Sequence, residues 1–227
     1  MIPRPELPLI VALDISDVDV ADELAGRLAP EVGMLKVGLE LFWAGGPEAV
    51  RRIASHGPVF LDSKLHDIPN TVERASANIA RLGVSMLNVH ALGGEAMMRA
   101  ALEGAKRGAD GAGVPVPLVI AVTVLSSQSG EDLASPASLA FEAKTAGLDG
   151  VVVSGVDVKD VRDACGNAFC LVVPGIRPKG ANGHDQVRVL HPLEAVELGA
   201  DYLVVGRPVT DAADPVGVVR GILRDLR

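Results

Sequence analysis

The chain has few of the features that mark secreted, membrane-spanning or nucleic-acid-binding proteins. Its only two cysteines, Cys165 and Cys170, do not have CxxC spacing and are too few for a disulfide framework, which favours a reduced, intracellular setting. No stretch approaches the roughly 18 uncharged apolar residues that a transmembrane helix needs. Acidic residues outnumber basic ones by 29 to 21, so the net charge of −8 argues against a nucleic-acid-binding surface.

Signals for secretion and for metal binding are also missing. The N-terminal residues read MIPRPELPLIVALDIS, where Asp14 interrupts a short apolar run and no cleavage site follows. We therefore expect a cytoplasmic protein. None of the five histidines pairs with another at the spacing of metal ligands, so no metal site is expected. These histidines are His56, His66, His90, His184 and His191.

Eight short apolar runs recur along the 227 residues, 48% of which are hydrophobic. Near-continuous apolar runs are typical of strands buried on both faces of a parallel sheet. The runs span residues 7–15, 34–39, 58–64, 86–92, 117–125, 150–155, 168–176 and 201–207. Helical patterns are predicted between them at 17–28, 71–82, 95–104, 136–146, 191–198 and 214–226.

This alternation favours an α/β fold, a (β/α)8 TIM barrel that forms a single domain over residues 1–227. A doubly wound sheet usually has fewer strands and a glycine-rich turn after the first one, whereas here the first run ends in Asp14-Ile15-Ser16. No linker or low-complexity segment divides the chain.

The most informative stretch is residues 59–72, which read VFLDSKLHDIPNTV. Alternation along a strand places Asp62 and Lys64 on the same side, and Asp67 follows just past the expected strand end. Two carboxylates around one ammonium would keep Lys64 charged and positioned, as a proton donor requires. Asp–Lys pairs at exposed strand ends are also common in proteins where they have no function. The ends of the other expected strands therefore decide whether this cluster belongs to a site.

Further polar residues fall at the carboxyl ends of the other expected strands, where barrel enzymes build their active sites. A buried Lys36 without a partner would be costly, and we expect Asp14 and Asp62 to pair with it across the barrel mouth. We expect Trp43 and the two cysteines to be packing residues and His90 to be a hydrogen-bonded wall residue. The polar residues are Asp14, Lys36, Asp62, Lys64, Asn88, His90, Thr123, Ser126, Arg177 and Arg207.

The end of the chain predicts a phosphate site. The segment 174–188, PGIRPKGANGHDQVR, offers Arg177 and Gln186, and Gly206-Arg207 follows the eighth run. Barrels often bind phosphate with the loops after strands seven and eight, and two arginines can bind it bidentately. The glycine-rich segment alone could equally be a solvated loop, but Arg207 on the next strand favours phosphate.

These residues resemble the orotidine 5′-phosphate decarboxylase family over nearly the whole chain. The most specific part is the run Asp-x-Lys-x-x-Asp-Ile-Pro-Asn-Thr from Asp62 to Thr71. The shorter Asp-x-Lys-x-x-Asp pattern also occurs in a wider suprafamily. The continuation HDIPNT and the set Arg177, Gln186 and Arg207 narrow the resemblance to the orotidine 5′-phosphate decarboxylase family. Supporting segments are ALD at 12–14, KVG at 36–38, NVHA at 88–91, PGIRP at 174–178 and VGR at 205–207.

The resemblance implies cofactor-free decarboxylation of orotidine 5′-monophosphate to uridine 5′-monophosphate at the interface of a homodimer. Lys64 would protonate the C6 carbanion, beside Asp62 and Lys36 of the same subunit and Asp67 of the other. Ile68 and Thr71 of the partner would complete the pocket near the ribose. The implied substrate-binding residues are Asp14 and Lys36, Thr71, Ser126 (threonine in many bacterial members), and Arg177, Gln186, Gly206 and Arg207.

Two other functions fit parts of the pattern. A keto-gulonate-phosphate decarboxylase of the same suprafamily would use Mg²⁺ and an extra acidic ligand near Lys36, for which Glu40 lies too far along the chain. A non-catalytic barrel could bind a nucleotide, but a binder gains nothing from packing like charges together.

Overall fold

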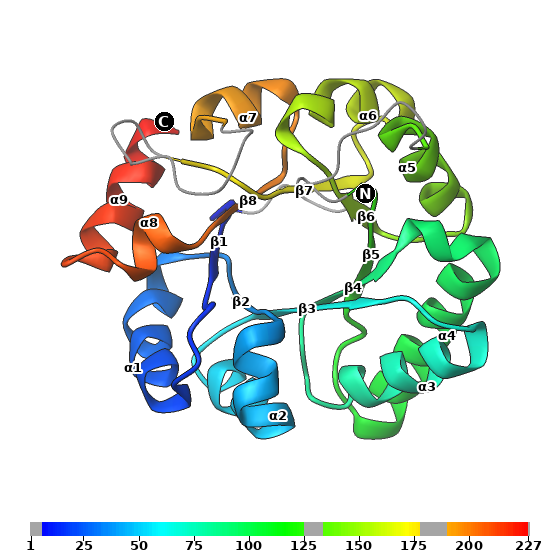
Figure 1. Cartoon of the computed structure of the whole chain (residues 1–227), viewed down its shortest axis with the longest axis horizontal. Helices are drawn as coiled ribbons and strands as arrows, with labels where there is room; N and C mark the ends of the chain where they lie inside the picture. The colour runs from blue at the N-terminus through cyan, green and yellow to red at the C-terminus, as the bar shows by residue number, and fades with distance from the viewer. Residues whose placement is uncertain (1–5, 125–133, 178–189, 227) are drawn as a thin grey trace.

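The computed structural model describes residues 6–124, 134–177 and 190–226, and these form a closed barrel of parallel strands. The strands lie in sequence order around the barrel, and β8 pairs with β1 to close it (Figure 1). The predicted (β/α)8 TIM barrel is thus confirmed. The strands are β1 (Leu9–Ala12), β2 (Met34–Val37), β3 (Val59–Leu65), β4 (Met86–His90), β5 (Leu118–Val122), β6 (Gly150–Val152), β7 (Cys170–Val173) and β8 (Tyr202–Val205).

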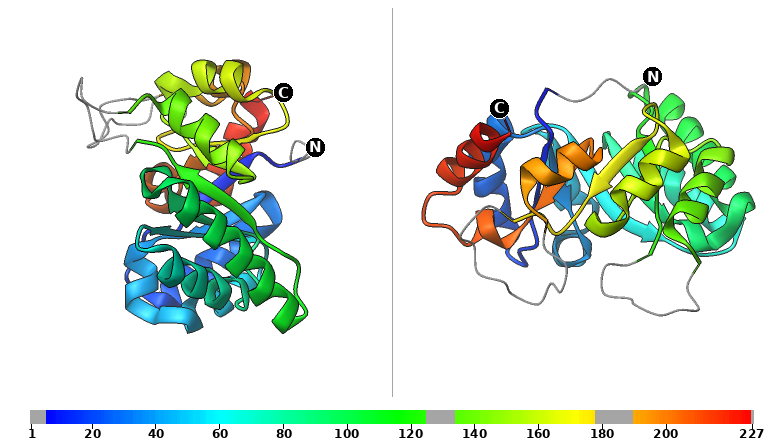
Figure 2. Two further views of the ribbon diagram at one scale, coloured as in Figure 1. Left: turned by 90° about the vertical axis from the view of Figure 1, so that its right-hand side faces the viewer. Right: turned by 90° about the horizontal axis from the view of Figure 1, so that it is seen from above.

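Helices surround the strands on the outside, as the two views of Figure 2 also show. No helix in the described ranges is both long and apolar enough to cross a bilayer. The helices are α1 (Val18–Leu28), α2 (Leu39–Ala54), α3 (Pro69–Ala80), α4 (Gly94–Ala112), α5 (Pro136–Thr145), α6 (Val158–Cys165), α7 (Pro192–Leu198), α8 (Arg207–Thr210) and α9 (Pro215–Asp225). Short 3₁₀ turns occupy Ala29–Glu31, Ala91–Gly93 and Gly155–Asp157.

The predicted helix starts have clear local causes. The Asp17 carboxylate accepts hydrogen bonds from the backbone N–H groups of Asp19 and Val20, which caps α1. Asp214 caps α9 in the same way, and Pro215 occupies the first helical position, where its missing N–H costs nothing. The helices expected at 17–28 and 214–226 therefore form with shifts of one residue at their ends.

Helices α2 and α6 were not predicted, and α4 runs to Ala112 instead of ending at Gly104. In α2, Gly46 has φ 59° and is followed by Pro47, so a kink interrupts the helical pattern. In α4, a glycine usually signals a helix end, but Gly104 is needed for packing. A side chain there would collide with the backbone of Glu73 in α3.

The core has two layers separated by the barrel wall. One layer fills the barrel interior and includes Phe60, Met86 and Cys170, and a larger layer lies between the strands and the helices. Cys165 and Cys170 are both free thiols and both buried, which confirms that they pack in the core. Trp43 differs from the cysteines, because 80% of its surface is exposed and its ring makes an edge contact with Phe42. The expectation that Trp43 is a packing residue is therefore wrong within this chain.

Candidate active site

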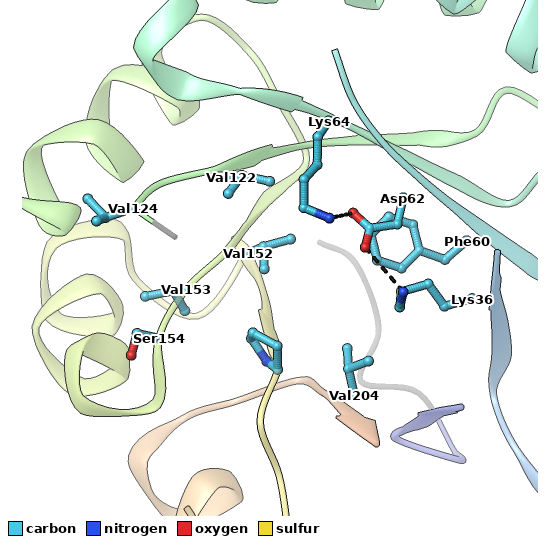
Figure 3. A pocket seen from close by; sticks show the side chains of 11 residues that line it. Lys36, Phe60, Asp62, Lys64, Val122, Val124, Val152, Val153, Ser154 and Val204 are labelled. Atoms are coloured by element: carbon cyan, nitrogen blue, oxygen red, sulfur yellow. Dashed lines mark hydrogen bonds and ion pairs between the residues drawn. The ribbon is translucent and has the colours of Figure 1, made fainter. Parts of the chain in front are cut away.

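Two lysines on neighbouring strands share one carboxylate at the mouth of the barrel. Lys64 Nζ lies 2.6 Å from Asp62 Oδ1, and Lys36 Nζ lies 3.3 Å from Asp62 Oδ2 (Figure 3). Lys36 Nζ also lies 3.0 Å from Asp14 Oδ1, just beyond β1. The expected partners of Lys36 are therefore confirmed, and three adjacent strands bring the four charges together.

The two members of this array that are largely withdrawn from water, Asp62 and Lys36, remain charged. Burial alone would raise the pKa of Asp62, but attraction to Lys36 and Lys64 and hydrogen bonds from Lys64 and Asn88 lower it overall. Burial likewise opposes the charge of Lys36, and attraction to Asp62 and Asp14 raises its pKa above the ordinary value. Both groups are thus ionised at neutral pH, and their field acts in a region of low dielectric constant.

A pocket of about 180 Å³ lies against the array. Lys36, Asp62 and Lys64 line one side, while Val122, Val152 and Val204 lie across from them (Figure 3). A small flat ring with one charged substituent would fit such a pocket, because the substituent can meet the charges while the face of the ring contacts the valines. The remaining lining residues are Phe60, Val124, Val153, Ser154 and Pro174.

The predicted second carboxylate of the array lies elsewhere in this chain. Asp67 is exposed, and its Oδ1 accepts a hydrogen bond from the backbone N–H of Ile68 at 2.6 Å. Among the described residues no ion pair joins Asp67 to Lys64 of the same chain, so any pairing of these two groups would have to come from the second subunit that the resemblance implies. Ile68, with 66% of its surface exposed, and Thr71 likewise face away from the core.

Three of the four predicted phosphate residues, Arg177, Gly206 and Arg207, fall at the adjacent rim of the barrel. Arg177 is buried shortly after β7, and its backbone N–H donates to Leu190 O. Gly206 and Arg207 follow β8, which pairs with β7, and Arg207 is exposed at the start of α8. The two other residues expected at the substrate, Ser126 and Gln186, lie outside the described residues.

Two further residues bear on the alternatives. Glu40 is exposed and accepts a hydrogen bond from Ser16 Oγ at 2.7 Å, so it does not join the Lys36 array. Within residues 6–124, 134–177 and 190–226, no three acidic, histidine or cysteine side chains gather as metal ligands do. His90 is half-buried beside His66, with ring centroids 5.5 Å apart, and burial together with the neighbouring His66 and Lys64 lowers its pKa.

Asn88 is a site residue whose role the sequence pattern did not reveal. Its Nδ2 donates to Asp62 Oδ1 at 2.7 Å from the neighbouring strand β4. Asn88 was expected among the polar residues at the strand ends, but the sequence around it does not indicate which group it binds.

Comparison with known proteins shows which family the chain is similar to. A sequence model of the orotidine 5′-phosphate decarboxylase / HUMPS family matches residues 7–222. The orotidine 5′-phosphate decarboxylase of Moorella thermoacetica is 47% identical over 96% of this chain and 91% of that protein. That of Nitratidesulfovibrio vulgaris strain DP4 is 49% identical over 96% of this chain and 97% of that protein.

A solved structure leads to the same family. The orotidine 5′-phosphate decarboxylase of Lactobacillus acidophilus superposes with a TM-score of 0.85 at 35% identity, covering 98% of this chain and 100% of that one. Family match, sequence relatives and structure all extend over nearly the whole barrel. The chain therefore belongs to the orotidine 5′-phosphate decarboxylase / HUMPS family.

Proposed function

We propose that this protein decarboxylates orotidine 5′-monophosphate to uridine 5′-monophosphate and CO₂, the last step of de novo pyrimidine biosynthesis. The observation that supports this most directly is the shared carboxylate of Asp62 between Lys36 and Lys64, opposite an apolar pocket wall. The relatives named orotidine 5′-phosphate decarboxylase support the same substrate.

In the proposed reaction, the bond between C6 of the pyrimidine and its carboxylate breaks, and CO₂ leaves without the bonding electrons. The electron pair stays on C6 as a carbanion that no conjugated carbonyl can accept, so the site must stabilise it electrostatically. The Lys64 ammonium faces this charge and then transfers a proton to C6, regaining one from solvent after product release.

Asp62 and Lys36 prepare the site for this step. The negative charge of Asp62 beside the substrate carboxylate disfavours the bound substrate relative to the transition state, in which that carboxylate becomes neutral CO₂. Lys36 holds Asp62 in place and is itself held by Asp14. Asp14, whose side chain is 51% exposed, remains accessible to a ribose hydroxyl.

We assign the 5′-phosphate to Arg177, Gln186, Gly206 and Arg207, and the pyrimidine edge to Ser126. Binding of a phosphate remote from C6 could supply energy that is used in the transition state. No protein group in this scheme needs a metal or an organic cofactor.

We further propose a cytoplasmic homodimer in which Asp67, Ile68 and Thr71 enter the partner's site. Exposed apolar side chains follow three adjacent strands at the same rim: Leu39 after β2, Ile68 after β3 and Leu92 after β4, exposed by 48%, 66% and 51%. Trp43 lies one helical turn beyond Leu39 in α2. Large exposed apolar side chains gathered on neighbouring elements favour a protein interface.

The test is the absorbance change on mixing purified protein with orotidine 5′-monophosphate, with and without EDTA. Loss of orotidylate absorbance that EDTA does not affect supports the proposal. Absence of turnover contradicts it, and metal-dependent turnover of keto-gulonate phosphate would favour the sugar-phosphate decarboxylase instead. Tight uridylate binding without turnover would identify a binding protein.

A further inference from the structure

Three consecutive residues of β3 lie opposite a single residue of β4. Leu61 pairs with Leu87 and Leu65 pairs with Val89, so Asp62, Ser63 and Lys64 face only the position between those partners. That position is Asn88. The extra residues form an irregular bulge, a feature that redirects side chains and is frequent beside active sites.

Asn88 forms a hydrogen bond with each of the three residues it faces. Its Nδ2 donates to Asp62 Oδ1 at 2.7 Å, and its Oδ1 accepts from the backbone N–H of Lys64 at 2.7 Å. Its backbone oxygen accepts from Ser63 Oγ at 2.9 Å. Asn88 is completely buried, and a carboxamide is suited to this position because it offers a donor and an acceptor at once.

The backbone of Lys64 needs such support. Its φ of 48° makes it the only non-glycine residue with positive φ in the described part of the chain. A lysine in this left-handed region is strained and persists only where its surroundings enforce it. The Lys64 N–H bond to Asn88 replaces the strand pairing that the bulge interrupts, while Lys64 Nζ lies 2.6 Å from Asp62 Oδ1.

We propose that Asn88 is a positioning residue that sets the geometry of the Asp62–Lys64 pair. It acts on both partners, through the side chain of Asp62 and the backbone of Lys64. The inference rests on the proposed decarboxylase function for its kinetic readout, but its structural readout is independent of that function.

The kinetic test compares N88A with V89A. Val89 is the next residue of β4, is buried in the outer core layer and belongs to no part of the site, so V89A controls for loss of stability. We expect N88A to lower kcat for orotidine 5′-monophosphate by about 10²-fold, the size of effect that a displacement of about 1 Å produces, with little change in KM. V89A should keep kcat within a factor of about two, since it leaves this geometry intact.

A second variant, N88D, separates positioning from simple packing. At neutral pH its carboxylate would lie beside Asp62 and could not donate. When protonated, it again offers one donor and one acceptor. The charged neighbours of the position are Asp62 and Lys64 on β3 and Lys36 behind them on β2. His90 on β4 is titratable but has a lowered pKa, and Ile120 pairs with the position from β5. We expect the kcat of N88D relative to wild type to rise as the pH falls.

The structural test is a crystal structure of N88A. We expect Lys64 to leave the left-handed region and its Nζ to move out of hydrogen-bond distance from Asp62. A structure that retains positive φ at Lys64 and the Asp62 contact would overturn the proposal, as would an active wild type for which N88A and V89A have equal kcat. An inactive wild type would instead refute the decarboxylase assignment, while the crystal structure would still decide the role of Asn88.

Discussion

Asp62 accepts from Lys64 Nζ through one carboxylate oxygen and pairs with Lys36 through the other, at 2.6 and 3.3 Å. One carboxylate thus sets the position of two ammonium groups at the pocket wall. Removing any member changes both the local charge and the position of the others.

Replacement of Lys64 by alanine should abolish proton delivery to C6. We expect K64A to lose at least about 10⁴-fold in kcat/KM, the upper range for a general acid, and more if Lys64 also stabilises the carbanion. The side chain is 31% exposed, so the variant should remain folded by circular dichroism. K159A, which removes an exposed lysine paired with Asp163, serves as the control and should retain full activity. Near-normal turnover by K64A would remove this lysine from the mechanism.

The acid stability of the protein should depend on Asp62. Its pKa in the folded state lies below the ordinary 3.8, because Lys36 and Lys64 outweigh the effect of burial. Its stabilisation is therefore complete above pH 3.8 and is lost as the pH falls through the lower folded value. In urea unfolding between about pH 2 and pH 5, the difference in free energy of unfolding between wild type and D62N should shrink toward acid. Parallel curves for the two proteins would contradict this.

The contribution of Lys36 to stability should have the opposite pH dependence, because it should be lost in alkali instead of acid. Its folded pKa lies above the ordinary 10.5, because Asp62 and Asp14 outweigh the effect of burial. The stabilisation from its charge is present below pH 10.5 and is lost as the pH rises through the folded value. The advantage of wild type over K36M in urea unfolding should therefore diminish in strong alkali. A constant difference up to the alkaline limit of folding would show that the ion pairs do not stabilise the fold.

The close contact of α3 and α4 should not tolerate a methyl group at Gly104. A Cβ atom there would collide with the backbone of Glu73, and we expect G104A to lower the free energy of unfolding by about 1–3 kcal/mol. Gly111 is the matched control because it lies in the same helix with open space around it. G111A should be neutral or stabilising by up to about 1 kcal/mol. Equal melting temperatures for G104A and wild type would show that α4 can shift away from α3.

Loss of Arg207 should weaken binding of the phosphate. We expect R207A to raise KM for orotidine 5′-monophosphate by about 10- to 10²-fold, the equivalent of one charged hydrogen bond. Orotidine, which lacks the phosphate, is the internal control, since its slow turnover should be nearly the same with R207A and wild type. A similar loss with both substrates would place Arg207 near the pyrimidine.

The proposed exchange of Asp67 between subunits can be tested with two inactive variants. Refolding K64A together with D67A would form hybrid dimers that contain one intact site and one doubly altered site. For random pairing we expect recovery of up to about a quarter of wild-type activity. If each chain uses its own Asp67, the mixture should remain as inactive as the separate variants.

Much of the architecture could be predicted from local patterns. Most strands are short apolar runs that are largely buried on both faces, and residues such as Asp17 and Asp214 cap helix starts by accepting hydrogen bonds from their immediate neighbours. The predicted α4 was too short because Gly104 looked like a helix end. Its actual role, which is to let α4 approach the backbone of Glu73 in α3, depends on tertiary packing. The kink at Gly46 concealed α2 for a related reason, since its helical pattern is broken within the sequence.

The charged residues of the site could also be predicted, because Asp62 and Lys64 stand at the end of one apolar run and Lys36 interrupts another. Their pairing follows from strand order, which places β1, β2 and β3 side by side. The sequence does not predict three other features of the site: the distances, the left-handed backbone of Lys64 and the contacts of Asn88. Each of them depends on the register between β3 and β4. Local chemistry along the chain thus decides which residues can react, whereas the packing of strands distant in sequence decides which of them meet and in what geometry.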